Sequence, residues 1–243
     1  MNRVYTSISQ IPQLVDVSRE TLEQLQNAGA IRACKKGSLI YQATKRQDML
    51  YFLMEGKAFT YTLTGEGHRK IIFILGPGAF LNESVAKNET ACTYCQMMTA
   101  GKVFEIPRKT MLRLMEKDFA LTCALMGIEE RKIWRMSHQL KNSMGKIYME
   151  KKLAAKLWKL ARDFGEPVGE SSDEVQIDLD LSVTFLADYL GAPRETTSRV
   201  CKKLSDRGLI RMEKKRITIR SMKCMALFYK NKCDDPCNNC SGK

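Results

Sequence analysis

Residues 31–107 contain short apolar segments separated by glycines, and this alternation leaves the N-terminal part of the chain few possible folds. The segments are SLIY, MLYFLMEG, AFTYTL, RKIIFIL and KVFEI, all rich in the β-branched and aromatic residues that favour strands. The glycines at or near the breaks are Gly37, Gly56, Gly65, Gly67, Gly76, Gly78 and Gly101. Several short strands at this spacing predict a β-barrel or β-roll.

After Pro107 the sequence pattern becomes helical, and apolar residues recur at heptad spacing. They are Met126, Ile133, Leu140 and Ile147, with Met136 at the intermediate position. This pattern predicts a long helix over residues 123–147 with one apolar seam. The helix either packs on its own domain or pairs with a second copy of the chain. Its polar flanking residues favour the second interpretation: Glu129, Glu130, Arg131, Lys132 and Arg135.

The segment TFLADYLGAPRETTSRVCKKLSDRGLI, residues 184–210, reads as two short helices joined at Gly191, a residue that permits a tight turn. The second helix begins near Pro193. The residues expected to face inward are Thr197, Val200, Cys201 and Leu204. The predicted DNA contacts are Arg194, Glu195, Thr196, Ser198, Arg199 and Lys202. A recognition helix presents such an N-terminal half to base edges in the major groove.

The distribution of charge agrees with an anionic partner. The net charge is +13, and residues 194–223 carry eleven Lys or Arg against three acids. By itself this excess is also typical of a solvated face. A hairpin, LIRMEKKRITI, follows Gly208, and it places Arg211, Lys214, Lys215 and Arg216 where phosphates can be held. A further strand is predicted upstream, from the alternation of apolar residues over 175–181.

These patterns predict an α+β chain with four parts. Residues 1–122 form a β-roll sensor domain, and residues 123–147 form a dimerisation helix. Residues 148–222 form a winged helix-turn-helix that binds DNA, and residues 223–243 form a cysteine-rich tail. Gly145 is the expected hinge between the two folded parts.

LADYLGAPRETTSR and DRGLI resemble the Crp/Fnr family of bacterial transcription regulators. YFLMEGKAFTYTLTGEGHRKIIFILGPGAFLNES is similar to that family's β-roll, a cyclic-nucleotide-binding-like jelly roll, and the seam helix falls where the family has its dimer helix. The resemblance covers nearly the whole chain. It implies a homodimer that binds palindromic double-stranded DNA and, if it is an activator, contacts RNA polymerase.

Within that family, three residues match the E-x-x-S-R pattern of the branch named for fumarate and nitrate regulation: Glu195, Ser198 and Arg199. The match implies half-sites of the TTGAT type. Arginine can bond two acceptors of guanine, and glutamate can accept from a cytosine amino group.

The resemblance fails at the position where cyclic-nucleotide binders hold the phosphate. Glu83 occupies the place of their ribose-binding glutamate, but Ala91 and Cys92 stand where their Arg-Ser pair belongs. A buried phosphate without a cationic partner is costly, so we expect no binding of cAMP. The effector pocket, if it is used, takes another ligand. Haem would need His68 or His138, and both fit a polar role equally well.

Four cysteines lie in the C-terminal tail: Cys224, Cys233, Cys237 and Cys240, spaced C-x8-C-x3-C-x2-C. Four thiolates can hold a [4Fe–4S] cluster or a tetrahedral zinc ion, and the spacing does not separate these from unligated or redox-active thiols. Some members of the resembled family carry a cysteine cluster at this end. The remaining cysteines are scattered, and we interpret most of them as small buried residues.

Several function classes are not supported by the sequence. There is no long apolar stretch for a membrane span, and MNRVYTSISQ lacks the features of a secretory signal. We therefore expect a cytoplasmic protein whose nine cysteines are reduced or bind metal. With no nucleophile elbow, no glycine-rich phosphate loop with lysine and two histidines, an enzyme is not predicted. A metal- or redox-buffering protein remains the competing hypothesis.

Overall fold

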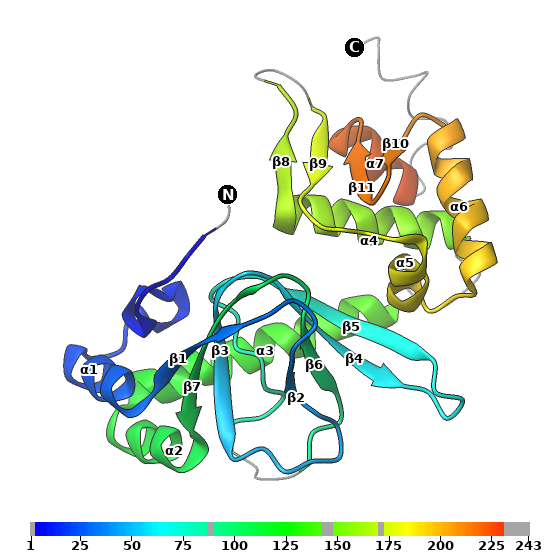
Figure 1. Ribbon diagram of the computed structural model, residues 1–243. Coiled ribbons are helices and arrows are strands. Elements are labelled where there is room, and N and C mark those ends of the chain that lie inside the picture. The colour runs from blue at the N-terminus through cyan, green and yellow to red at the C-terminus, as the bar shows by residue number, and fades with distance from the viewer. Residues whose placement is uncertain (1–2, 87–89, 142–147, 170–172, 231–243) are drawn as a thin grey trace. The chain divides into compact units, whose positions relative to one another are not determined.

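The computed structural model describes residues 3–86, 90–141, 148–169 and 173–230 (Figure 1). It divides into two compact units, residues 2–138 and residues 139–243. No helix among the described residues is long and apolar enough to cross a membrane.

The N-terminal unit contains two antiparallel sheets, as the glycine-punctuated segments predict. One has the strand order β1-β7-β3 and the other β2-β6-β4-β5. The strands are β1 (Ala30–Cys34), β2 (Leu39–Tyr41), β3 (Met49–Glu55), β4 (Ala58–Leu63), β5 (Arg69–Leu75), β6 (Tyr94–Met97) and β7 (Gly101–Pro107). Gly101 is required where β7 begins, because a Cβ there would lie 2.0 Å from the Glu55 carbonyl oxygen. The predicted β-roll is confirmed.

Helices pack against the roll on a large apolar core. They are two 3-10 turns (Ile8–Gln10 and Pro12–Leu14), α1 (Arg19–Ala28), α2 (Arg108–Lys117) and α3 (Phe119–Lys141). Ser18 caps α1 by accepting a hydrogen bond from the Thr21 amide. The core includes Phe52, Phe80 and Phe104, all almost completely buried. The roll and its helices are thus stabilised as one hydrophobic unit.

Helix α3 has two apolar faces, where the heptad pattern indicated one. Leu121, Leu125 and Ile128 are buried in the core of the roll. The seam residues remain exposed: Met126, Ile133, Met136 and Leu140. The helix begins at Phe119, four residues before the predicted start, because Asp118 accepts hydrogen bonds from the Ala120 and Leu121 amides at its first turn. Ile147 and the expected hinge at Gly145 lie outside the described residues.

The C-terminal unit is a winged helix-turn-helix. Its helices are α4 (Met149–Phe164), α5 (Val183–Leu190), α6 (Arg194–Asp206) and α7 (Met222–Tyr229). Its strands are β8 (Gly165–Pro167), β9 (Val175–Ile177), β10 (Ile210–Glu213) and β11 (Arg216–Ile219), in the sheet order β10-β11-β9-β8. The strand expected over 175–181 ends at Ile177, because the chain turns there: the Leu179 amide donates to the Ile177 carbonyl. Leu179 and Leu181 are nevertheless buried.

Candidate nucleic-acid interface and sensor residues

Two short helices and the turn between them form the candidate nucleic-acid interface. Ser182 caps α5 by accepting from the Phe185 amide at 3.1 Å. Gly191 ends α5 in the left-handed region with φ 74°, a conformation that favours glycine, and its amide donates to the Ala187 carbonyl. Pro193 then precedes the first residue of α6. The local sequence therefore fixes both the end of one helix and the start of the next.

The inner face of α6 anchors the helix in the unit. Thr197, Val200, Cys201 and Leu204 are buried, as the spacing predicts. The Thr197 hydroxyl donates to the Pro193 carbonyl at 3.1 Å, which satisfies a buried polar group. Burial raises the pKa of the Cys201 thiol to about 11, so this cysteine stays protonated at neutral pH. It packs as a small apolar residue.

The outer face of α6 carries the residues that sequence analysis assigned to DNA. Arg194, Glu195, Ser198, Arg199 and Lys202 are exposed, and Thr196 is half-buried. The Arg199 guanidinium approaches the Thr196 hydroxyl at 3.4 Å, an i,i+3 contact that orients the arginine along the helix. One helix face thus presents three cations, a carboxylate and two hydroxyls, the groups that hydrogen-bond base edges and phosphates.

The β10–β11 hairpin separates the four basic residues proposed for phosphate contact into two kinds. Arg211 is 3.4 Å from Glu174 and 3.1 Å from Glu213. Arg216 is 2.8 Å from Asp178 and 3.7 Å from Asp180. Both arginines are therefore used within the unit. Lys214, with φ 56°, and Lys215 form the turn and are exposed.

A carboxylate of α4 that pairs with basic residues near the end of α6 was not indicated by any sequence pattern. Glu150, in the first turn of α4, accepts from the Lys203 ammonium at 2.8 Å and lies 3.8 Å from the Arg207 guanidinium. It is separated from these residues by more than fifty positions, so no local pattern pointed to the pairing.

In the β-roll, Glu83 is satisfied by neighbouring donors. The Cys92 amide donates to one carboxylate oxygen at 2.8 Å, and the Thr93 hydroxyl donates to the other. Ala91 and Cys92, at the positions of the phosphate-binding pair, carry no positive charge that could hold a phosphate. The arrangement is that of an internally satisfied structural group.

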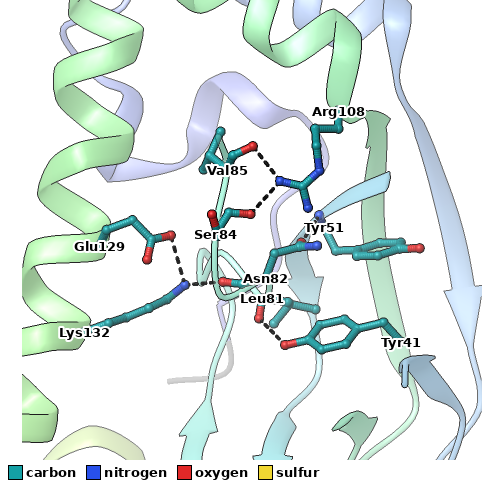
Figure 2. Close-up of polar contacts among 9 residues, drawn as sticks. All are labelled: Tyr41, Tyr51, Leu81, Asn82, Ser84, Val85, Arg108, Glu129 and Lys132. Carbon is teal, nitrogen blue, oxygen red and sulfur yellow. Dashed lines mark hydrogen bonds and ion pairs between the residues drawn. The ribbon is translucent and has the colours of Figure 1, made fainter. Parts of the chain in front are cut away.

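Residues 81–85, the segment that contains Glu83, are held by hydrogen bonds to their main chain and to the Asn82 side chain (Figure 2). The Tyr41 hydroxyl donates to the Leu81 carbonyl at 2.8 Å. The Asn82 side chain accepts from the Tyr51 amide at 2.7 Å and donates to the Met49 carbonyl at 3.0 Å. Strands β2 and β3 thereby fix one end of the segment.

Arg108, the first residue of α2, fixes the other end of the segment. Its guanidinium donates to the Ser84 carbonyl at 2.8 Å and to the Val85 carbonyl at 2.5 Å (Figure 2). It also donates to the Gln47 carbonyl at 2.8 Å. The side chain is buried, and burial lowers its pKa from the ordinary arginine value. Three main-chain acceptors are satisfied by this one cation.

Helix α3 contacts the same segment through Lys132 (Figure 2). The ammonium donates to the Asn82 carbonyl, lies 3.5 Å from Glu129 and sits 4.7 Å from the centre of the Phe80 ring. Burial lowers the pKa of Lys132 and raises that of Glu129. Sequence analysis interpreted both residues as polar flanks of the seam; instead they face the protein's own roll.

The two histidines are not brought together. His68 lies in the β4–β5 turn, exposed and 3.6 Å from Glu66. The His138 ring lies tilted by 33° against the Trp134 ring of α3, with ring centres 3.9 Å apart.

The described cysteines include no assembled metal centre. Cys34, Cys95, Cys201 and Cys224 are buried, and Cys92 and Cys123 are exposed. Among the described residues, no group of three His, Cys, Asp or Glu is placed to hold a metal ion. Of the four tail cysteines, Cys224 lies in the first turn of α7, while Cys233, Cys237 and Cys240 lie outside the described residues.

Comparisons with known proteins match both units. Residues 151–227 match the Crp-like helix-turn-helix domain family, and residues 31–118 match the cyclic nucleotide-binding domain family. The chain is 26% identical over 223 residues to the anaerobic regulatory protein of Pasteurella multocida, covering 89% of this chain and 78% of that protein. It is 25% identical over 227 residues to the fumarate and nitrate reduction regulatory protein of Salmonella typhimurium, covering 90% and 87%. The structure of FixK2 from Bradyrhizobium japonicum matches the fold with a TM-score of 0.69 at 17% identity, over 82% of this chain and 96% of that one.

Proposed function

Because this chain belongs to the Crp/Fnr family of bacterial transcription regulators, we propose that it binds a palindromic DNA site as a homodimer and reads it with the outer face of α6. The chain is a DNA-binding transcription regulator of this type. Our proposal concerns the DNA sequence that it recognises, its dimer interface and the signal to which it responds. The observation that carries the proposal is the exposed row of Arg194, Glu195, Ser198, Arg199 and Lys202 on a helix whose opposite face is buried.

Base reading is assigned to Glu195, Ser198 and Arg199. An arginine donates two hydrogen bonds to guanine, and a glutamate accepts from cytosine, which suits a TTGAT-type half-site. Lys215, at the exposed hairpin turn, is assigned to phosphate. A contact with RNA polymerase is expected if the protein is an activator.

The test of this assignment is selection of bound duplexes from a random pool by the purified protein. We expect an inverted repeat of TTGAT-type half-sites, bound with an affinity that falls steeply as salt increases. Enrichment of no common sequence would contradict sequence-specific reading by α6.

The dimer is proposed to form along the seam of α3. Ile133 and Leu140 are each 64% exposed, and Met126 is 55% exposed, an apolar row that a lone helix would leave in water. Pairing with a second copy buries this row in the manner of a two-stranded coiled coil.

Replacing both Ile133 and Leu140 with Asp should give monomers that no longer bind the palindrome. Arg131→Asp, an exposed change on the same helix, is the control and should leave the dimer intact. Light scattering that shows an unchanged dimer for the double variant would rule out this seam.

For the signal, we propose that the tail holds a metal centre through Cys224, Cys233, Cys237 and Cys240. Four thiolates suit a [4Fe–4S] cluster, which would supply oxygen or redox sensitivity, or a structural zinc ion. The relatives named for anaerobic regulation and for fumarate and nitrate reduction favour the redox alternative. Cys224 is 6% exposed, so its thiol would serve from the edge of the core of the C-terminal unit.

Metal analysis of anaerobically purified protein tests the centre. We expect about one centre per chain, lost in the Cys237→Ser, Cys240→Ser double variant and retained in Cys123→Ser, which changes an exposed cysteine of α3. Less than about 0.2 equivalents of both iron and zinc would leave the tail a thiol switch at most.

A small molecule bound by the β-roll is the second candidate signal. The observation that favours it is that α3, the proposed dimer helix, touches residues 81–85 through Lys132. Cyclic AMP and cyclic GMP should not bind at micromolar concentration, because Ala91 and Cys92 supply no cation for the phosphate. Calorimetric titration checks this, and tight binding of either nucleotide would refute it.

A further inference from the structure

Arg207 lies where three helices of the C-terminal unit meet. Its amide caps α6 by donating to the Lys203 carbonyl at 3.1 Å. Its guanidinium lies 3.8 Å from the Glu150 carboxylate of α4 and 5.5 Å from the centre of the Phe228 ring of α7. One side chain at the end of the recognition helix therefore touches both helices behind it.

Helix α7 is held firmly on its other contacts. The Trp158 indole of α4 donates to the Met222 carbonyl at 3.1 Å, and the Trp158 ring lies 5.9 Å from Tyr229. Met225 and Phe228 are almost completely buried. Because protein interiors are closely packed, a displacement of α7 should also move the residues that pack against it.

Cys224 and Phe228 are four residues apart in α7 and both are buried, so they share one face of the helix. We therefore expect a change in the position of Cys224 to shift the Phe228 ring as well. The ring supports the Arg207 guanidinium through a cation–π contact, which depends on the ring's face.

We propose that Arg207 is a positioning residue that transmits the position of α7 to the recognition helix α6. It does so by holding the end of α6 against the Phe228 ring and the Glu150 carboxylate together. The use of this contact for signalling rests on the proposed metal centre of the tail, because Cys224, one of its four proposed ligands, lies in α7. The coupling between the two helices does not depend on the metal.

A double-mutant cycle measures the coupling. Full-length wild type, Arg207→Gln, Phe228→Leu and the double variant are compared for affinity to the duplex that the wild type enriches from a random pool. We expect the combined loss of affinity to differ from the product of the single losses by a factor of about 3 or more. Multiplicative losses would overturn the proposal.

Lys151 provides a matched control, because its ammonium lies over the same Phe228 ring at 5.6 Å but belongs to α4. The cycle of Lys151→Gln with Phe228→Leu should show no coupling in DNA affinity. Equal coupling in both cycles would mean that the ring acts only through general stability, against the proposal. If Arg207→Gln melts early, Arg207→Lys replaces it, since lysine keeps the charge toward Glu150 but loses the planar guanidinium.

The link to the tail is tested separately. Cys237→Ser, Cys240→Ser is expected to change DNA affinity in the wild type and to have a much smaller effect when Arg207 is Gln. If the cysteine changes act equally in both backgrounds, transmission through Arg207 is wrong. If they change neither metal content nor affinity in the wild type, the proposed metal signal fails, while the cycle still decides the coupling of α7 to α6.

Discussion

Two cations of the β-roll unit and two of the C-terminal unit differ in what they contact. In the β-roll unit, Arg108 and Lys132 point inward and donate to main-chain carbonyls of residues 82–85. In the C-terminal unit, Arg199 and Lys215 point into solvent from a helix and a hairpin turn. The net charge of +13 therefore includes cations that stabilise the fold and cations that are available to an anionic partner.

Whether a cation is buried or exposed indicates which property its removal should change. A buried cation is costly unless its donors are satisfied, so its removal is expected to affect stability. An exposed cation contributes little to stability and remains available to bind an anionic partner. Substitutions in the two units should consequently separate into those that change unfolding and those that change DNA affinity.

The largest effect is expected at Arg108. Arg108→Met removes the donor to three carbonyls and should lower the free energy of unfolding of the β-roll unit by about 3 kcal/mol or more, because buried acceptors lose their partner. Denaturant unfolding of the full chain measures this. Arg113→Met, an exposed change on α2, is the control and should be nearly neutral. An unchanged free energy of unfolding in Arg108→Met would show that this buried cation does not stabilise the β-roll unit.

Loss of the exposed Arg199 side chain should reduce discrimination between bases and leave the free energy of unfolding nearly unchanged. Arg199→Ala should cost about 1–3 kcal/mol on the selected duplex and relax one base position, since a bidentate contact to guanine is lost. Competition between specific and random duplexes measures the effect. Equal weakening of both would show that Arg199 does not read bases.

Asp118 tests the internal use of charge through pH. The Ser18 hydroxyl, the largest cause, lowers the pKa of Asp118 to about 2, below its ordinary value. Because the folded-state pKa is depressed, the carboxylate's contribution is complete above the ordinary pKa near 4 and is lost as the pH falls toward 2. Asp118→Asn keeps an accepting oxygen at the start of α3, so at neutral pH it should remove only the contribution of the charge, about 0.5 kcal/mol for a carboxylate at a helix N-terminus.

The measurement for Asp118 is the difference in unfolding free energy between wild type and Asp118→Asn as a function of pH. This difference should shrink between about pH 4 and pH 2. Glu116→Gln, an exposed change two residues earlier, should show no such trend. A constant difference across this range would mean that Asp118 acts without its charge.

The smallest effect is expected at Lys215. Lys215→Ala should weaken binding to specific and random duplexes alike and reduce the slope of log affinity against log salt by about 1, because one phosphate contact is lost. Lys109→Ala, an exposed change in the other unit, should leave the slope unchanged. A loss confined to the specific duplex would move Lys215 from phosphate contact to base reading.

Elements that depend on interactions between nearby residues could be predicted from the sequence alone. Glycine-separated apolar segments predicted the β-roll, and Gly191 with the inward spacing of Thr197, Val200 and Leu204 predicted the helix-turn-helix. Turn chemistry and the alternation of buried and exposed residues act over a few positions, so they can be read along the chain. The seam residues and the four tail cysteines were likewise recognised from their spacing along the chain.

The partners of the charged side chains could be identified only from the three-dimensional contacts. Sequence spacing placed Glu129 and Lys132 beside a seam, but the Lys132 ammonium donates to the Asn82 carbonyl, fifty positions earlier in the chain, and pairs with Glu129. Arg211 and Arg216, which the sequence places where phosphates can be held, also lie beside Glu174 and Asp178. Glu150, Arg207 and Phe228 likewise meet across α4, α6 and α7. Whether a cation is paired depends on atoms within about 4 Å in space, and chain order does not encode that distance for residues of different elements.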